Sequence, residues 1–332
     1  MSPDIVPVLP RSLARAGYAF LPTPIADAGA DASERFIEFF TANIRNKNTR
    51  LAYARAVYQF FDWCDDRGLR LQDLKPTHTA GYIERHPGAK PSVKQHLAAI
   101  RMLFDYLVTG GVLPMNPVSS VRGPKHVVKR GKTPVLTADQ ARTLLDSIET
   151  SAIVDSVETP LIVGLRDRAL IAVMVYTFAR VGAVVTMKVE DYYQNGKRWW
   201  FRLHEKGGKR HEVPAHHKAE EYMDAYLDAA DLWKVKKGPL FRSVDRHREL
   251  SERPMHRNDV LDMIKRRDRN AGLPESTCCH TFRATGITAY LENGGTIENA
   301  QAIAAHESPR TTKLYDRTGD EITLDEIEKI MI

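Results

Sequence analysis

The sequence predicts a mainly α-helical protein of two domains, with a small antiparallel β-sheet in the second domain. Its 332 residues are more than one average domain needs. Apolar residues recur at helical spacing up to residue 110 and again after residue 136. A stretch of β-forming and aromatic residues near residue 200 runs into Gly207-Gly208, a pair that is typical of a hairpin turn.

The first 110 residues divide into an arm and a helical domain. Residues 1–30 are rich in proline and alanine without a clear period, which predicts an extended arm or, alternatively, a flexible tail. Residues 31–110 hold four helical patterns. The second pattern follows Thr49, a candidate N-cap, the third runs near Thr77–His86, and the fourth runs from Ser92 to Leu107.

Residues 111–136 are predicted to be a linker, because their prolines and glycines discourage regular structure. The stretch is basic, as a DNA clamp needs, although an ordinary linker can also be basic. In the helical domain, the fourth pattern places His96 and Arg101 partly outward. These polar faces either bind phosphates or are simply solvated. The candidate DNA-binding residues are Lys47, Arg50, Lys94, Arg101, Lys125, Lys129 and Arg130.

The second domain is predicted to span residues 137–332. Thr137 is a candidate cap of its first helix, and a strongly apolar helix over 167–178 ends just before Arg180. Residues 187–193, 199–203 and 211–213 are β-like, with Lys206 at the turn between the last two. Two further helices are expected at about 216–230 and 257–271.

Residues 279–317 are predicted to form three short helices that carry reactive side chains. His280 and Arg283 are three apart and share a helix face. Gly294-Gly295 ends the first helix, Thr296 caps the second, and Ser308-Pro309 begins the third. His306 precedes the third helix, and Tyr315 is expected about two turns into it. Two imidazoles, a guanidinium and a phenol suit an anion that the phenol could attack.

Composition narrows the class of protein. The formal charge of +6 fits an anionic partner, but solubility explains it equally well. Three cysteines make no disulfide framework, which favours a reducing cytoplasm. Neither a signal peptide nor a membrane span is predicted. No phosphate-binding GxxxxGK[ST] loop occurs, and the spacing of His211 and His216 does not fit a metal motif, so we expect neither a nucleotide cofactor nor a metal.

The six groups in order resemble the catalytic set of the tyrosine recombinase (phage integrase) family. They are Arg180, Lys206, His280, Arg283, His306 and Tyr315. The resemblance extends over roughly residues 31–332. It implies a helical core-binding domain and a mixed α/β catalytic domain that together clamp duplex DNA. It also implies a site-specific recombinase for integration, excision or resolution of a DNA element, acting through a 3′-phosphotyrosine intermediate without a cofactor.

The resemblance further implies roles for individual residues. Tyr315 would be the nucleophile and Lys206 the acid for the leaving oxygen, while the arginines and histidines bind the phosphate and move protons. It implies specific recombination sites, a homotetramer in the synapse with a monomer or dimer off DNA, and docking of a helix over 324–332 on a neighbour. Two alternatives stay open: a type IB topoisomerase-like enzyme, and a DNA-binding protein without catalysis.

The sequence departs from the family pattern in three places. Ala183 stands where an acidic residue often follows the first arginine by three, which leaves open how Arg180 and Lys206 are held. Ala284 stands where a histidine is common, and Ala304-Ala305-His306 replaces a frequent Leu-Gly-His.

Overall fold

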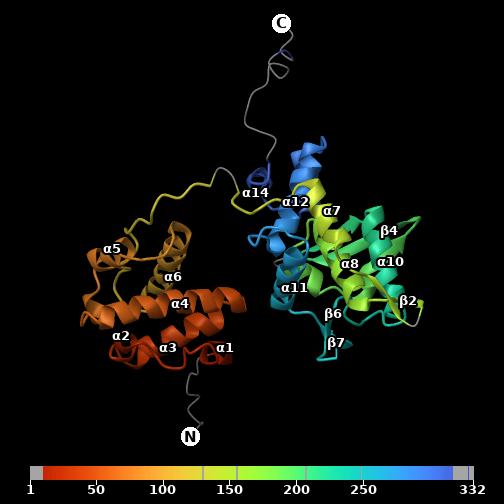
Figure 1. Cartoon of the computed structure of the whole chain (residues 1–332). Helices are drawn as coiled ribbons and strands as arrows, with labels where there is room; N and C mark the ends of the chain where they lie inside the picture. Colours follow the sequence, from red (N-terminus) through yellow and green to blue (C-terminus); the bar gives the residue numbers. More distant parts are fainter. Residues whose placement is uncertain are drawn as a thin grey trace. The chain divides into compact units, whose positions relative to one another are not determined.

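The computed structural model describes residues 10–128, 131–154, 156–205, 208–247, 249–316 and Glu328. The chain divides into two compact units, Met1–Val127 and Val128–Ile332 (Figure 1). The division falls inside the stretch that we predicted as a linker. The helical composition with small antiparallel sheets confirms the predicted fold class. Within the described ranges, no helix has the length and apolarity that a membrane span requires.

The first unit is built around two long helices, α4 and α6, whose aromatic side chains fill its core. Phe60 and Phe61 of α4 and Phe104 of α6 are fully buried and in ring contact. Short helices and turns complete the unit. Its elements are α1 (Arg11–Ala14), α2 (Thr23–Ala26), α3 (Ala30–Glu38), a π-helical turn (Phe39–Asn43), α4 (Lys47–Asp65), a 3-10 turn (Leu71–Asp73), α5 (Pro76–Glu84) and α6 (Lys90–Thr109).

Three expectations for this unit are wrong. Residues 10–30 are not extended, because α1 and α2 fold onto the unit and bury Leu13 and Ile25 in its core. Proline helps to start such short helices, since its fixed φ suits the first turn. The cap of α4 is Asn46, not Thr49: the Asn46 side chain accepts hydrogen bonds from the backbone N of Asn48 and of Thr49. Asparagine ranks above threonine as an N-cap.

His96 is also buried, at 8% exposure, rather than partly outward. Its Nδ1 lies 3.0 Å from Nε2 of His86 and 3.1 Å from the hydroxyl of Tyr82. The helical period placed His96 at the edge of the apolar face, and the neighbouring rings of α5 and the following loop cover it. Burial, and then the neighbouring His86 and Arg55, lower the pKa of His96 to about 4.

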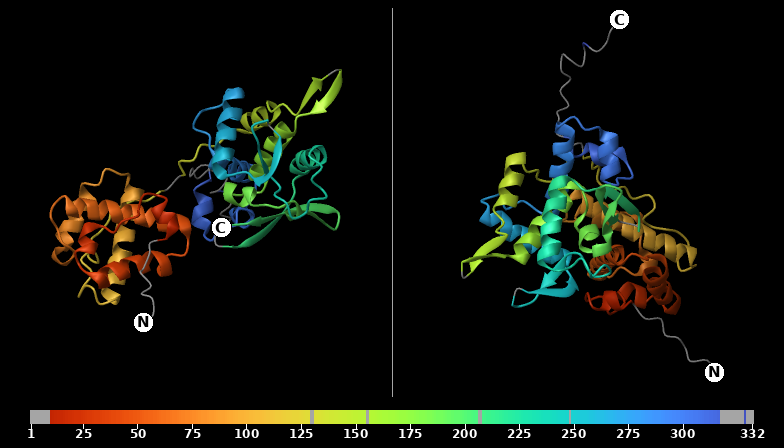
Figure 2. Two further views of the ribbon diagram at one scale, coloured as in Figure 1. Left: turned by 90° about the horizontal axis from the view of Figure 1, so that it is seen from below. Right: turned by 90° about the vertical axis from the view of Figure 1, so that its right-hand side faces the viewer.

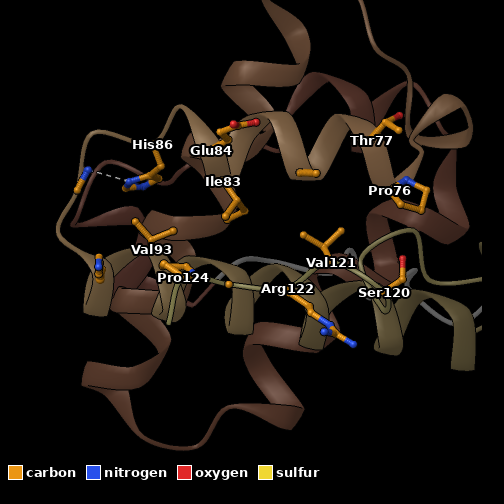
Figure 3. A pocket seen from close by; sticks show the side chains of 14 residues that line it. Pro76, Thr77, Ile83, Glu84, His86, Val93, Ser120, Val121, Arg122 and Pro124 are labelled. Carbon is orange, nitrogen blue, oxygen red and sulfur yellow. Dashed lines mark hydrogen bonds between the residues drawn. The ribbon is translucent and has the colours of Figure 1, made fainter. Parts of the chain in front are cut away.

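The segment after α6 has no helix or strand before residue 138 in its described part, as its prolines predict. Its first half nevertheless packs on the helical unit. Asn116 Nδ2 donates to the backbone O of Arg101 at 3.1 Å and to Asp105 Oδ1 at 2.6 Å. Arg101 donates to the backbone O of Val121 at 2.6 Å. Figure 3 shows the pocket that this segment forms with α5, where Val121 and Pro124 lie opposite Ile83.

The second unit packs helices around one apolar helix, and its described part also carries three small antiparallel sheets (Figures 1 and 2). The sheets pair β1 with β2, β3 with β4 and β5, and β6 with β7. Its elements are α7 (Ala138–Asp146), β1 (Ser151–Val154), β2 (Val157–Pro160), α8 (Ile162–Tyr176), α9 (Val181–Val185), β3 (Tyr192–Asn195), β4 (Arg198–His204), β5 (Arg210–Pro214), α10 (His217–Ala229), β6 (Arg242–Val244), β7 (Leu250–Pro254), α11 (Arg257–Asn270), α12 (Cys279–Glu292), α13 (Ile297–Ile303) and α14 (Pro309–Lys313).

Helix α8 is the centre of this unit, with α10 and α12 packed against it. A helix that is apolar on all sides is expected to be buried. It begins at Ile162, five residues earlier than predicted, because the charged pair Arg166 and Asp167 is itself buried. Asp167 accepts from Arg166 at 2.7 Å and from Arg267 of α11 at 2.8 Å, which fastens α11 to α8.

The strands that lead toward the site agree with the prediction in part. β4 and β5 pair antiparallel with Phe201 opposite Val213, as the turn signal predicts. Residues 189–191 form a 3-10 turn instead of a strand, and β3 begins only at Tyr192. The hairpins β1–β2 and β6–β7 were not predicted. Figure 2 shows β1–β2 projecting from the unit, which explains why Ile153 there is 81% exposed.

Candidate active site

The loop between α8 and α9 positions Arg180 beside a buried carboxylate. Phe178 has a φ of 54°, a left-handed conformation that is strained for an L-residue and often marks functional sites. Arg180 is the N-cap residue of α9 and is half-buried. Its Nη1 donates to Glu205 Oε2 at 2.5 Å, and the Glu205 side chain is only 4% exposed. The first arginine is therefore held by an acid from the end of β4.

Arg283 lies inside α12 and is almost completely buried, at 1% exposure. Its guanidinium donates to the backbone O of Phe178, and to the backbone O of Ala304 at 2.6 Å. It thereby ties the α8–α9 loop to the end of α13. Burial, and then the charge of Arg180, lower the pKa of Arg283 to about 10, so it remains protonated at neutral pH. Its Nε has no hydrogen-bond partner in the described part of the chain.

The phenol of Tyr315 lies within hydrogen-bond distance of an imidazole on α12. The Tyr315 hydroxyl is 3.1 Å from Nε2 of His280, and the tyrosine is 7% exposed. Thr288, about two turns further along α12, donates its hydroxyl to the backbone O of Tyr315 at 2.9 Å. Helix α12 therefore contacts Tyr315 at both its ring and its backbone.

The prediction that Tyr315 lies inside a helix is wrong. α14 ends at Lys313 with Leu314 as its C-cap, and the backbone N of Tyr315 donates to Thr312 O in the closing turn. The Ser308 cap and Pro309 at the first helical position are as predicted. Start signals fix where the helix begins but not where it ends, and Tyr315 lies just beyond its C-cap, where Thr288 of α12 binds its carbonyl.

His306 lies just beyond α13, with its ring stacked on that of Tyr315 at a centroid distance of 5.9 Å. Its Nδ1 is 2.9 Å from the hydroxyl of Thr312. The preceding Ala305 has a φ of 48°, in the left-handed region. Burial, and then the charges of Arg283 and Arg180, lower the pKa of His306 to about 3, so the imidazole is neutral at physiological pH.

The structure thus brings five of the six predicted groups into one cluster. They are Arg180, His280, Arg283, His306 and Tyr315. The sixth, Lys206, lies outside the described residues, although its neighbour Glu205 contacts the cluster. Among the described residues, no group of three or more metal-ligating side chains occurs. The cluster offers fixed cations, neutral imidazoles and a phenol, which fits attack on a phosphate ester.

Residues 134–321 match the model of the phage integrase family, which is more than half of the chain. The chain belongs to the phage integrase family. Residues 34–111 match a second model, the N-terminal SAM-like domain of phage integrases. The predicted family is therefore confirmed.

Individual relatives of this phage integrase family member resemble it in sequence or in fold over most of its length. It is 27% identical over 294 residues to tyrosine recombinase XerD of Listeria monocytogenes, over 86% of this chain and 93% of that protein. The XerH site-specific recombinase in a post-cleavage complex with palindromic difH substrate has a TM-score of 0.66 at 17% identity, over 96% of this chain and 92% of that one. A lambda integrase tetramer bound to a Holliday junction has a TM-score of 0.60 at 20% identity, over 94% and 83%. Both solved structures share the fold.

Sequence reasoning missed Glu205 in this family member. The signal was present, since Ala183 lacks the acid that the family often has there, and a glutamate directly precedes Lys206. In the structure Ala183 is buried, at 3% exposure, and the carboxylate reaches Arg180 from the sheet instead. Only the fold brings residues 180 and 205 together.

The predicted DNA-binding cations fall into three groups. Lys47, Lys94 and Lys125 are exposed. Arg50 and Arg101 already donate to backbone carbonyls, those of Ile44 and Val121, so part of each guanidinium serves the fold. Lys129 and Arg130 lie outside the described residues.

Proposed function

We propose that the chain is a site-specific tyrosine recombinase that cleaves and rejoins DNA through a 3′-phosphotyrosine intermediate. The observation that carries the proposal is the Tyr315 hydroxyl at 3.1 Å from His280 Nε2, inside a cluster that also holds Arg283 and His306. A phenol next to a proton acceptor and fixed cations is an activated nucleophile for an anionic ester.

The two arginines would neutralise the scissile phosphate. Each guanidinium presents planar N–H donors that match non-bridging phosphate oxygens. Arg180 donates one N–H to Glu205 while its side chain is 34% exposed, so donors remain there for a ligand, whereas the buried Arg283 would act mainly through its charge. Donors held in place before the reaction stabilise the charge that develops in the transition state.

His280 would receive the proton of Tyr315. Desolvation of the ring by the surrounding protein, and then the charges of Arg283 and Arg180, lower the pKa of His280. Its imidazole is therefore neutral, and Nε2 can accept the proton. When a phosphate offsets those charges, the pKa of His280 rises and the imidazole becomes a better base. His306 would contribute a second neutral imidazole, stacked on the tyrosine ring.

The chemical step balances within the chain and the DNA. The Tyr315 oxygen forms a bond to phosphorus, and the bond from phosphorus to the 5′ oxygen breaks. The leaving oxygen takes a proton, for which we propose Lys206 as the donor. Attack by a 5′ hydroxyl then reverses the step on the same or another strand, and the phosphotyrosine retains the energy of the phosphodiester. No cofactor enters the proposal.

The proposed partners are duplex DNA with specific recombination sites and three further copies of this chain. The likeness in fold to a lambda integrase tetramer on a Holliday junction supports a homotetramer in the synapse, with a monomer or dimer off DNA. We predicted that a helix over 324–332 docks on a neighbour; apart from Glu328, that segment lies outside the described residues. We also propose a cytoplasmic location, since the three cysteines are free.

Capture of the covalent intermediate tests the proposal and identifies the DNA site in the same experiment. The protein is incubated with sheared genomic DNA of its source, and complexes that survive detergent are collected and their DNA ends sequenced. We expect adducts that share one sequence in the wild type and none in Tyr315→Phe, which should bind DNA as the wild type does. Adduct formation by Tyr315→Phe, or its absence in the wild type, would contradict the proposal.

A plasmid assay separates recombination from topoisomerase action. Supercoiled plasmids with two copies, one copy or no copy of the recovered sequence are incubated with the protein. We expect rearranged products only from the plasmid with two copies. Relaxation of all three plasmids without rearrangement would favour a type IB topoisomerase-like enzyme.

A further inference from the structure

Glu205 is a carboxylate that the fold removes from water and places against Arg180. Its side chain is 4% exposed, while that of Arg180 is 34% exposed, and Oε2 lies 2.5 Å from Nη1. A buried carboxylate is costly unless it is paired and hydrogen-bonded. The partly exposed Arg180 side chain therefore has one side of its guanidinium held by the protein and the other side accessible.

The backbone of Glu205 is fixed as well. Its N donates to Lys209 O at 2.9 Å, and its O accepts from the N of Gly208 at 3.1 Å. These two bonds fix the backbone from which the carboxylate projects, directly after the end of β4, and Lys206 is the next residue in the sequence. Because the Glu205 side chain is 4% exposed and paired with Arg180, it has little freedom to move away from that arginine.

The charge that Glu205 supplies has no counterpart on the helix of Arg180. Three positions further along, α9 carries the buried methyl group of Ala183. Arg180 and Arg283 repel each other, since the charge of Arg180 lowers the pKa of Arg283, and the charge of Glu205 acts in the opposite direction. Glu205 therefore stabilises this pair of cations before a phosphate binds to them.

We propose that Glu205 is a positioning residue for DNA cleavage. Its carboxylate holds the Arg180 guanidinium in one orientation, so that the remaining N–H donors point toward the non-bridging oxygens of the scissile phosphate. This inference rests on the proposed function. In this inference Glu205 acts by orienting Arg180. The alternative, which the test can also reveal, is that Glu205 acts by placing Lys206.

The first test compares single-turnover cleavage by Glu205→Gln with cleavage by the wild type. The substrate is a nicked suicide duplex built from the sequence recovered by adduct capture. We expect the cleavage rate at saturating protein to fall about 30-fold. The variant keeps the Arg180 donor and loses only its fixed orientation, which costs less than removing the donor altogether. The Kd for the duplex should change less than threefold. A rate within twofold of the wild type would overturn the inference.

Glu212→Gln is the matched control. Glu212 lies on the neighbouring strand β5, is exposed, and pairs with Arg202 at 2.8 Å, away from the cluster. Its cleavage rate should equal that of the wild type. Thermal unfolding of each variant shows whether it folds. If the glutamine variant does not fold, Glu205→Asp takes its place: the shorter side chain should cleave at least fivefold more slowly, and wild-type cleavage would overturn the inference.

A sulfur-substituted substrate separates Arg180 from Lys206. In this duplex the 5′ bridging oxygen at the scissile position is replaced by sulfur, which leaves as a thiolate and needs no proton. The defect of Lys206→Ala should disappear on it, while that of Glu205→Gln should persist at tenfold or more. Recovery of Glu205→Gln would show that Glu205 acts through Lys206 and would overturn the assignment to Arg180.

The two proposals fail in different ways. If the wild type forms no adduct with DNA, the proposed function fails, whatever Glu205 does. If the wild type forms the adduct through Tyr315 and Glu205→Gln matches it, only the inference about Glu205 fails.

Discussion

Removal of one buried hydroxyl on α12 should slow DNA cleavage without weakening DNA binding. Thr288 is 2% exposed and donates to the backbone O of Tyr315 at 2.9 Å. In Thr288→Val the side chain keeps its shape, but this carbonyl loses its donor. A buried polar group left without a partner costs about 1–3 kcal/mol.

The cost should fall on the segment that carries Tyr315 rather than on the whole unit. α14 has only five residues, and a helix of that length is marginal by itself. The docked position of Tyr315 therefore depends on a few contacts, which include the hydroxyl–imidazole contact to His280 and the bond from Thr288. A loss of about 2 kcal/mol lowers the ratio of docked to undocked tyrosine about 30-fold.

We expect single-turnover cleavage by Thr288→Val to fall by up to about 30-fold at saturating protein, because only docked Tyr315 can attack and its population falls with the ratio of docked to undocked forms. Hydrogen exchange in residues 309–316 should become faster, while exchange in α8 stays unchanged. Wild-type cleavage together with faster exchange would refute the reasoning, since docking would then not limit the reaction.

Thr79→Val is the matched control for this substitution. Thr79 is fully buried in α5 of the helical unit, and its hydroxyl has no partner in the described part of the chain. The same change of side chain there should leave the cleavage rate unchanged and leave stability equal or slightly higher. A drop in cleavage by this variant would mean that the effect of Thr288→Val is not specific to Tyr315.

Two further predictions concern stability. Ala305→Gly should raise the free energy of unfolding of the catalytic unit by about 0.5–1 kcal/mol, because its φ of 48° strains alanine more than the added freedom of glycine costs in the unfolded chain; a lower urea midpoint would contradict this. The pKa of His96 is lowered to about 4 in the folded state, so the unfolded chain binds the proton first as the pH falls. The helical unit should therefore lose up to about 3 kcal/mol of stability between pH 6.5 and pH 4. His96→Gln should remove most of that loss in urea titrations at pH 7 and pH 4, and an equal loss in the variant would count against it.

The local signals along the chain were sufficient to predict most elements around the site. Thr137, Thr296 and Ser308 cap α7, α13 and α14 as expected. A cap and the N–H groups that it binds lie within one turn of each other, so the sequence contains the whole interaction. The order and spacing of the six reactive residues indicated the family in the same way, because both can be read from the sequence without knowing the fold.

Contacts between distant segments could not be predicted in this way. The burial of His96 depends on rings from α5 and its following loop, and the position of Tyr315 beyond α14 depends on its bonds to α12. Leu13 and Ile25 joined the core although their surroundings carried no helical period. In each case the deciding partner lies many residues away.

The sequence by itself determined the family, the two helical regions, the pairing of β4 with β5 and the set of candidate catalytic groups. Only the tertiary structure decided that Glu205, and not an acid on α9, pairs with Arg180, and that Arg283 ties two loops together through backbone carbonyls. The physical reason is that charge pairing depends on distance in space. A carboxylate 25 residues away along the chain becomes the nearest counter-charge once β4 and the α8–α9 loop converge.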